Sequence, residues 1–309
     1  MAQFLTFLLE GGNAVEVASR INQRNVASTL EDIYKKVLPE FKIKKSDTDK
    51  YVLLGSAGKK ADPDSSGDLD IAISMEHVKK AFRCKTEEDA VKKVSEIITS
   101  LASSIYKEYG HEGHLSVKDF FKLMPGLMTF SVGFPITNTD GKQEGLFVQL
   151  DIMPSDNVDL VGWAMSSPGY KESSTKGAVR NILLSTMIKY CEMKVVKKDD
   201  NGEPAVWKRY YLNPKSGLYY ATQERKLGKS GKYTKESSIT DKKLITGNKD
   251  KIIQFLFGPK HKASDYMTFE QLWAAFNSDD FKYQSKRDEI KKEFVDTLTR
   301  QKYDVPKLD

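Results

Sequence analysis

The first half of the chain mixes two spacings of apolar residues, one typical of helices and one typical of strands. Apolar residues that recur every three or four positions predict helices over 13–38, 76–83 and 86–109. Short apolar runs between turn residues predict strands over 51–54, 68–74, 127–134 and 145–152. The dipeptide Asp140-Gly141 between the last two is typical of a hairpin. This order predicts an α+β fold with a mixed sheet flanked by helices.

The second half has a different pattern. A stretch that opens within 170–181 predicts a helix running to about Met193. From residue 194 turn signals flank segments dense in Trp and Tyr, which predicts a β-hairpin. Three further helices are predicted over 249–258, 268–277 and 285–302. We therefore expect two domains, residues 1–165 and a basic, mainly helical domain over residues 166–309.

Composition narrows the class of protein. Apolar residues make up 39% of the 309 residues, and no apolar run approaches the roughly 18 residues that a membrane span needs, so no membrane is expected. The apolar stretch within 1–9 lacks a basic region and a cleavage site, so a signal peptide is not expected. The two cysteines, Cys84 and Cys191, form no Cys-x-x-Cys motif, which argues against disulfides and structural zinc. A reducing cytoplasm fits this composition.

The net charge of +6 is unevenly distributed along the chain. Residues 1–190 carry 24 Lys and Arg against 25 Asp and Glu, whereas residues 191–309 carry 25 against 18. Within 194–262 the count is 17 against 7. This distribution indicates either a lysine-rich solvated surface or a site for a polyanion in the C-terminal part.

The candidate chemistry lies between the first two predicted strands, in the sequence LGSAGKKADPDSSGDLDIAI over 54–73. Side chains two apart in a strand share a face, so the carboxylates of Asp68 and Asp70 lie side by side. Unpaired, they repel each other and raise each other's pKa, and Mg²⁺ or Mn²⁺ removes that repulsion. Gly55 lets backbone N–H groups approach a phosphate, and the Ser56 hydroxyl adds a donor.

The spacing of Gly-Ser and Asp-x-Asp resembles the signature of the polymerase-β-like nucleotidyltransferase superfamily. That superfamily includes CCA-adding enzymes, poly(A) polymerases, oligoadenylate synthases and bacterial cyclic-nucleotide synthases. It needs a third carboxylate on a neighbouring strand, and Asp151 in the run 146–154 matches, with Pro154 shortly after it. A P-loop is excluded, because the segment from Gly55 to Lys59 is too short for one.

The resemblance implies a nucleotidyltransferase-type sheet and transfer of an NMP from an NTP to an acceptor hydroxyl, with release of pyrophosphate. It implies that Asp68, Asp70 and Asp151 are the catalytic residues and bind the Mg²⁺ or Mn²⁺ ions. Gly55 and Ser56 would then hold the phosphates of a nucleotide such as ATP.

Four more residues are candidate nucleotide contacts. Lys59 either steadies a triphosphate or stays solvated. In the resembled family the helix after the catalytic sheet supplies Ser and Lys or Arg contacts to the nucleotide, and here Ser173, Lys176 and Arg180 open the predicted helix. The alternative is that these residues form the polar face of a core helix.

The acceptor is the least determined feature. Basic residues alternate with tyrosines in the C-terminal part, among them Lys226, Lys229 and Lys232, as in surfaces that bind nucleic acid by stacking and phosphate contact. We therefore expect template-independent addition to an RNA 3′ end. The alternatives are synthesis of a cyclic oligonucleotide, NMP transfer to a protein or small molecule, and a nucleic-acid-binding module with a decayed active site. An alternative role for the tyrosines is packing, in a β-hairpin that covers the helical domain.

Overall fold

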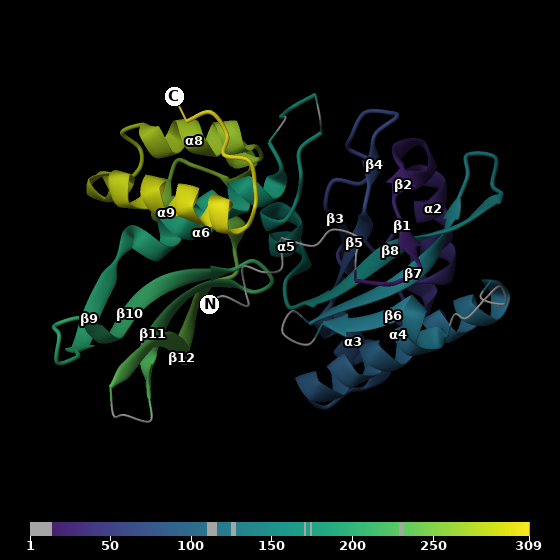
Figure 1. The fold of residues 1–309 in the computed structure, drawn as a ribbon, viewed down its shortest axis with the longest axis horizontal. Coiled ribbons are helices and arrows are strands. Elements are labelled where there is room, and N and C mark those ends of the chain that lie inside the picture. Colours follow the sequence, from purple (N-terminus) through teal and green to yellow (C-terminus); the bar gives the residue numbers. More distant parts are fainter. Residues whose placement is uncertain are drawn as a thin grey trace. The chain divides into compact units, whose positions relative to one another are not determined.

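The computed structural model describes residues 14–109, 116–124, 128–169, 171–173, 175–228 and 232–308. These residues group into two compact units that divide between residues 174 and 175, here called the N-terminal and C-terminal units. Each unit has its own main sheet, of six strands in the first and four in the second (Figure 1). The fold is α+β, as the sequence predicts. The domain boundary expected at residue 165 stays a prediction.

The N-terminal unit is built on a mixed sheet with strand order β3-β5-β8-β7-β6, in which β8 also pairs with β1. Strands β5 and β1 run parallel to β8, whereas β7 runs antiparallel to it. A separate small sheet pairs β2 with β4. The strands are β1 Ala18–Ser19, β2 Ile21–Asn22, β3 Tyr51–Leu54, β4 Ser65–Ser66, β5 Asp68–Ser74, β6 Phe121–Met124, β7 Thr129–Thr137 and β8 Gln143–Ser155.

The helices of this unit are α2 Gln23–Lys36, η2 Leu38–Phe41, α3 Met75–Phe82, α4 Glu87–Tyr109, η3 Val117–Phe120 and α5 Val158–Ala164. Helices α3 and α4 confirm the predicted helices over 76–83 and 86–109. Thr86 begins the second as expected, because its hydroxyl accepts a hydrogen bond from the backbone N–H of Asp89 at 3.0 Å.

The strands of this sheet have two different faces. Leu69 and Ile71 of β5 are buried in the main core together with residues of α2 and α4. Ala72 packs on the other face, with Val161 of α5. Because side chains alternate along a strand, Asp68 and Asp70 lie on this second face, away from the main core.

The helix predicted over 13–38 begins later than the sequence pattern indicates. Asn13 lies outside the described residues, and the helix α2 begins after Asn22, whose side chain accepts from the backbone N–H of Arg24. Ala18 instead belongs to β1, which pairs with Phe147 and Val148 of β8, and Ile21 belongs to β2. Pairing with a strand distant in sequence overrides the local helical spacing here.

The C-terminal unit combines helices with an antiparallel sheet of order β12-β11-β10-β9. Its elements are α6 Gly177–Cys191, β9 Met193–Lys198, β10 Pro204–Asn213, β11 Gly217–Leu227, β12 Tyr233–Thr246, α7 Lys249–Phe257, η5 Ala263–Tyr266, α8 Phe269–Asn277, η6 Gln284–Lys286 and α9 Arg287–Arg300. The predicted helices are present, and the aromatic hairpin is β10–β11. No helix in the described parts of either unit has the length and apolarity to cross a membrane.

Two strands of this sheet, β9 and β12, extend the predicted hairpin on both sides. Their residues are mostly exposed on both faces of the sheet. A strand with no buried face needs no alternation of apolar and polar residues, so the sequence pattern carries little signal for it.

Candidate active site

The three predicted carboxylates meet on the N-terminal sheet. Strands β5 and β8 are parallel neighbours, and their register places Asp70 directly beside Asp151. One oxygen from each of Asp68, Asp70 and Asp151 lies within 4.8 Å of the others. The expectation that a β-hairpin brings the third carboxylate beside the Asp68–Asp70 strand is therefore confirmed, since β7 and β8 form that hairpin.

Burial and repulsion from neighbouring carboxylates make Asp70 and Asp151 hard to ionise. Burial, together with the charges of Asp68 and Asp151, raises the pKa of Asp70 well above its usual range. Burial also raises the pKa of Asp151, to about 6, with a further contribution from Asp68. A divalent cation binds strongly to carboxyl groups in this state. It displaces their protons and neutralises the negative charges that then form.

Two buried side chains hold Asp151 in place. The Ser131 hydroxyl, on the paired strand β7, donates to Asp151 Oδ1 at 2.5 Å. Gln149 Nε2 lies 3.0 Å from each carboxylate oxygen of Asp151. The Gln149 side-chain oxygen accepts from the backbone N–H groups of Ala14 and Val15, at 2.7 and 3.3 Å. Gln149 thus links the chain before β1 to the acidic site.

Sequence reasoning missed Gln149 and Ser131. Both are fully buried polar residues within apolar strands. Gln149 lies two positions before Asp151, so the period of two that paired Asp68 with Asp70 could also have placed Gln149 on this face. Ser131 had no such signal, because its position depends on the register of the hairpin.

The Gly55-Ser56 turn lies directly beside Asp70. Leu54 pairs with Asp70 across the sheet, and Gly55 has a φ of +68°. A Cβ atom added at Gly55 would overlap Asp70 Oδ2. Both the backbone conformation and the close approach therefore require glycine at this position. The turn that sequence reasoning assigns to phosphate is thus adjacent to the carboxylates.

The loop after this turn is fixed by α2 and by the segment after α5. Gly58 donates its backbone N–H to Gln23 Oε1 at 2.7 Å, and Gln23 Nε2 donates to Ser66 Oγ at 2.8 Å. The ammonium group of Lys59 donates to the carbonyl of Ser167 at 2.7 Å. Lys59 is therefore held within the loop that follows the turn, half-buried, and is not a fully solvated side chain.

The residues predicted from the following helix divide between the units. Ser173 belongs to the N-terminal unit, where its backbone N–H donates to Gly169, and it does not cap α6, whose N-cap is Lys176. Arg180 belongs to the C-terminal unit and is buried. Its guanidinium donates to the carbonyls of Tyr266 and Met267, at 2.9 and 3.2 Å. These bonds join α6 to the segment before α8, so nucleotide contact by Lys176 and Arg180 stays a prediction.

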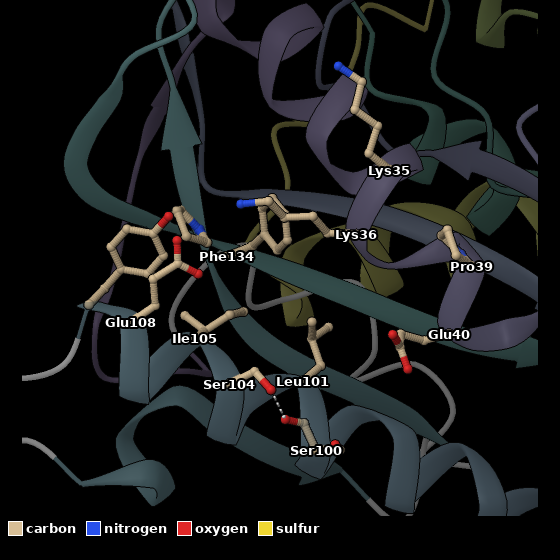
Figure 2. Close-up of a pocket in the computed structure, with 12 residues that line it drawn as sticks. Lys35, Lys36, Pro39, Glu40, Ser100, Leu101, Ser104, Ile105, Glu108 and Phe134 are labelled. Atoms are coloured by element: carbon tan, nitrogen blue, oxygen red, sulfur yellow. Dashed lines mark hydrogen bonds between the residues drawn. The ribbon is translucent and has the colours of Figure 1, made fainter.

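A separate groove of about 320 Å³ lies in the N-terminal unit, between α2, α4 and β7 (Figure 2). Leu101, Ile105 and Phe134 are among the residues that line it. Phe134 is three positions from Ser131 on β7, so its side chain points to the opposite face of the sheet from the carboxylates. The groove is therefore not part of the acidic site.

The acidic site fits a hard divalent cation. Its ligands are carboxylate oxygens alone, which suit Mg²⁺ or Mn²⁺, and no cysteine or histidine belongs to the cluster. Burial is the main cause of the raised pKa values of Asp70 and Asp151, and a bound cation would lower both pKa values.

Comparisons with known proteins add little to this geometry. No protein-family model matches the chain, and no curated protein matches it. Among solved structures, the chain is similar to the polymerase β of Leishmania infantum in a ternary P/T complex. The two are 14% identical with a TM-score of 0.39, and the match covers 81% of this chain and 78% of that one. A similarity this weak supports no conclusion about function, so the function is inferred from the residues of the site.

Proposed function

We propose that the protein is a metal-dependent nucleotidyltransferase, which moves an NMP from an NTP to an acceptor hydroxyl and releases pyrophosphate. The observation that carries this proposal is the meeting of Asp68, Asp70 and Asp151 within 4.8 Å, beside the Gly55-Ser56 turn. Oxygen ligands of this kind next to a glycine turn suit a metal-bound triphosphate.

The residues of the site have distinct roles in this proposal. Asp68, Asp70 and Asp151 would hold Mg²⁺ or Mn²⁺, which when bound stabilises negative charge on the phosphate that reacts. Gly55 and Ser56 would donate hydrogen bonds to the phosphates of the NTP, and Lys59 would add a positive charge. Asp151 would accept the proton of the acceptor hydroxyl, because it is the carboxylate that Ser131 and Gln149 hold in a defined orientation.

We further propose that the acceptor is an RNA 3′ end, extended without a template. The support is the charge of the C-terminal part, 25 basic against 18 acidic residues over 191–309. A polyanionic acceptor is attracted by such a surface. ATP is one candidate donor.

The direct test is to incubate the protein with each α-³²P-labelled NTP and Mg²⁺ or Mn²⁺, with and without RNA. Separation on gels and thin layers then identifies the product. We expect label in the RNA, and we expect Asp70→Asn to lower the rate at least about 100-fold, since metal sites supply several kcal/mol of transition-state stabilisation. Asp64→Asn is the matched control, because Asp64 is an exposed aspartate of the loop between β3 and β4.

The possible results separate the alternatives. Label in a small, phosphatase-resistant product would replace the RNA acceptor by a cyclic-oligonucleotide product and keep the acidic site. Label in protein would replace it by a protein acceptor. Wild-type turnover in Asp70→Asn would disprove the site assignment, and nucleotide binding without pyrophosphate release would support a binding module.

A further inference from the structure

We propose that one face of the C-terminal sheet is the surface that binds the single-stranded RNA acceptor. This surface, here called the lysine–tyrosine face, consists of Lys194, Lys208, Tyr210, Tyr220 and Lys243. The proposal rests on the proposed function in that the bound strand is taken to be the acceptor, but its binding can be measured without turnover.

The sheet as a whole is strongly basic. Residues 193–246, which span β9 to β12, carry 13 Lys and Arg against 6 Asp and Glu, a net charge of +7. This exceeds the net charge of the whole chain, which is +6. A surface with this excess attracts phosphates wherever its basic groups are exposed and are not already paired.

The structure separates the basic residues of the sheet that are paired from those that are not. Arg225 forms an ion pair with Asp199 at 2.9 Å, and Lys226 forms one with Glu236 at 2.9 Å. Arg209 is buried, at 7% exposure. These three residues are therefore poor candidates for phosphate contact, and of the residues named from the sequence Lys229 lies outside the described part of the chain.

Several other lysines of the sheet are exposed, including Lys197, Lys198 and Lys242. Lys194, Lys208 and Lys243 are exposed and form no ion pair with any described acidic residue. Lys194 pairs with Lys208 across β9 and β10, so their ammonium groups repel each other unless an anion lies between or above them. A phosphodiester backbone would supply that anion.

The strand register places the tyrosines on the same face as these lysines. Lys208 and Tyr210 are two apart on β10, and Tyr210 pairs with Tyr220 on β11. Tyr220 in turn pairs with Lys243 on β12. Residues that pair across strands share a face, as do residues two apart along one strand. The five residues therefore form a band that crosses all four strands of the sheet.

The two tyrosines offer rings on which bases can stack. Their ring centroids are 4.8 Å apart, and both side chains are half-buried. Phe255 of α7 packs against Tyr210 at 4.7 Å, so Tyr220 is the ring farther from the helix. Glu224 and Asp241 also lie on this face, opposite Val206 and Thr222, so we expect the phosphates to follow the lysines of β9 and β10.

The test is the binding of a fluorescein-labelled oligo(A) RNA, measured by fluorescence anisotropy over a range of salt concentrations. Replacement of Lys194, Lys208 and Lys243 together by Gln should weaken binding at least about 10-fold at low salt. It should also reduce the slope of log affinity against log salt by about two, since each phosphate contact of a single strand contributes about 0.7. The matched control replaces Lys260, Lys292 and Lys307, three exposed lysines outside the sheet, and should leave both quantities near the wild-type values.

Tyrosine variants separate stacking from charge. Tyr220→Ala should weaken binding about 10-fold without changing the salt slope, and Tyr220→Phe should restore it, because stacking needs only the ring. If the triple sheet variant binds like the triple control, the proposal is wrong. The proposal is also wrong if Tyr220→Ala binds RNA as tightly as the wild type and heparin competes as well as RNA does. The surface would then be a general polyanion site.

A separate comparison keeps this proposal distinct from the proposed function. Asp70→Asn should bind the RNA like the wild type, because the acidic site and the sheet belong to different units. RNA binding without any NMP transfer by the wild type would disprove the nucleotidyltransferase and leave the binding surface in place. If the wild type transfers NMP and the sheet variants bind RNA and react normally, the nucleotidyltransferase is supported and the binding surface is disproved.

Discussion

The acidic site and the lysine–tyrosine face both gather charges of one sign, but in different physical settings. The three carboxylates lie within 4.8 Å on the interior strands of a sheet, and Asp151 is 6% exposed. The lysines are exposed and are spread over three strands, two of which are edge strands. Solvent screens the lysines, so they can remain charged and mobile, whereas the carboxylates need protons or a cation.

The difference predicts how each region responds to change. Reacting groups must be held in a narrow range of geometry, so a small displacement at the acidic site costs much activity. Contacts to a flexible polyanion are nearly independent of one another, so each contributes a modest and roughly additive share of the affinity.

Removal of a single charge should have a much larger effect at the acidic site than on the lysine–tyrosine face. Asp151→Asn should lower the rate of NMP transfer at least about 100-fold, since it removes one of the three proposed metal ligands and the proposed proton acceptor. Lys208→Gln should weaken RNA binding only about two- to five-fold, the range expected for one exposed charge contact. Rates at saturating substrate and anisotropy measure the two effects. Equal effects of the two substitutions would contradict the contrast.

Gly55→Ala tests whether the positive φ of Gly55 and its close approach to Asp70 are needed for activity. We expect a 10- to 100-fold loss of activity, because the added methyl group would displace the Asp70 carboxylate. Gly141→Ala is the control, since Gly141 also has positive φ but has no atom within 4 Å of an added Cβ. Both variants should lose about 1 kcal/mol or more of stability from backbone strain. Only the first should lose activity.

Gln149→Met tests the support of Asp151. It keeps the size of the side chain but removes the donor to the carboxylate, and partners of metal ligands typically contribute 10- to 100-fold. Since the Gln149 hydrogen bond lowers the pKa of Asp151, its loss should also move the acidic limb of the pH–rate profile to higher pH. A purely structural role would leave that limb in place. Gln143→Met, at an exposed position of the same strand, is the control.

The metal-free protein should show an inverted pH dependence of stability at this site. The pKa values of Asp70 and Asp151 are raised in the folded protein, so their contribution to stability is most favourable below about pH 4. The contribution of Asp151 is lost as the pH rises through about 6, and that of Asp70 is lost as the pH rises through its own raised pKa. Mg²⁺ or Mn²⁺ should therefore stabilise the fold above about pH 6, by roughly 2.7 kcal/mol at 100 times the Kd, and much less below it.

Thermal melting with and without the cation measures this effect. Asp70→Asn should melt at a higher temperature than the wild type in the absence of cation near neutral pH, because it removes a buried charge. It should gain less from the cation. A cation effect that is equal in Asp70→Asn and the wild type would locate metal binding elsewhere.

Several features of the N-terminal unit follow from local sequence. The alternation in β5 places Asp68 and Asp70 on one face, and the apolar run ending at Pro154 marks the strand that carries Asp151. Thr86 and the stripe that follows it define α4. Each of these depends on periods of two or of three to four residues, which are properties of a single strand or helix.

Other features depend on contacts between distant parts of the chain. Residues 18–19 form a strand only because β8 lies beside them, and Gln149 is fixed by backbone groups 135 and 134 residues away. The lysines of β9, β10 and β12 lie on one face because of the register of the whole sheet, which pairs strands distant in sequence. Local periodicity contains no information on such pairings, so the tertiary structure alone decided which side chains support Asp151 and which basic residues remain exposed.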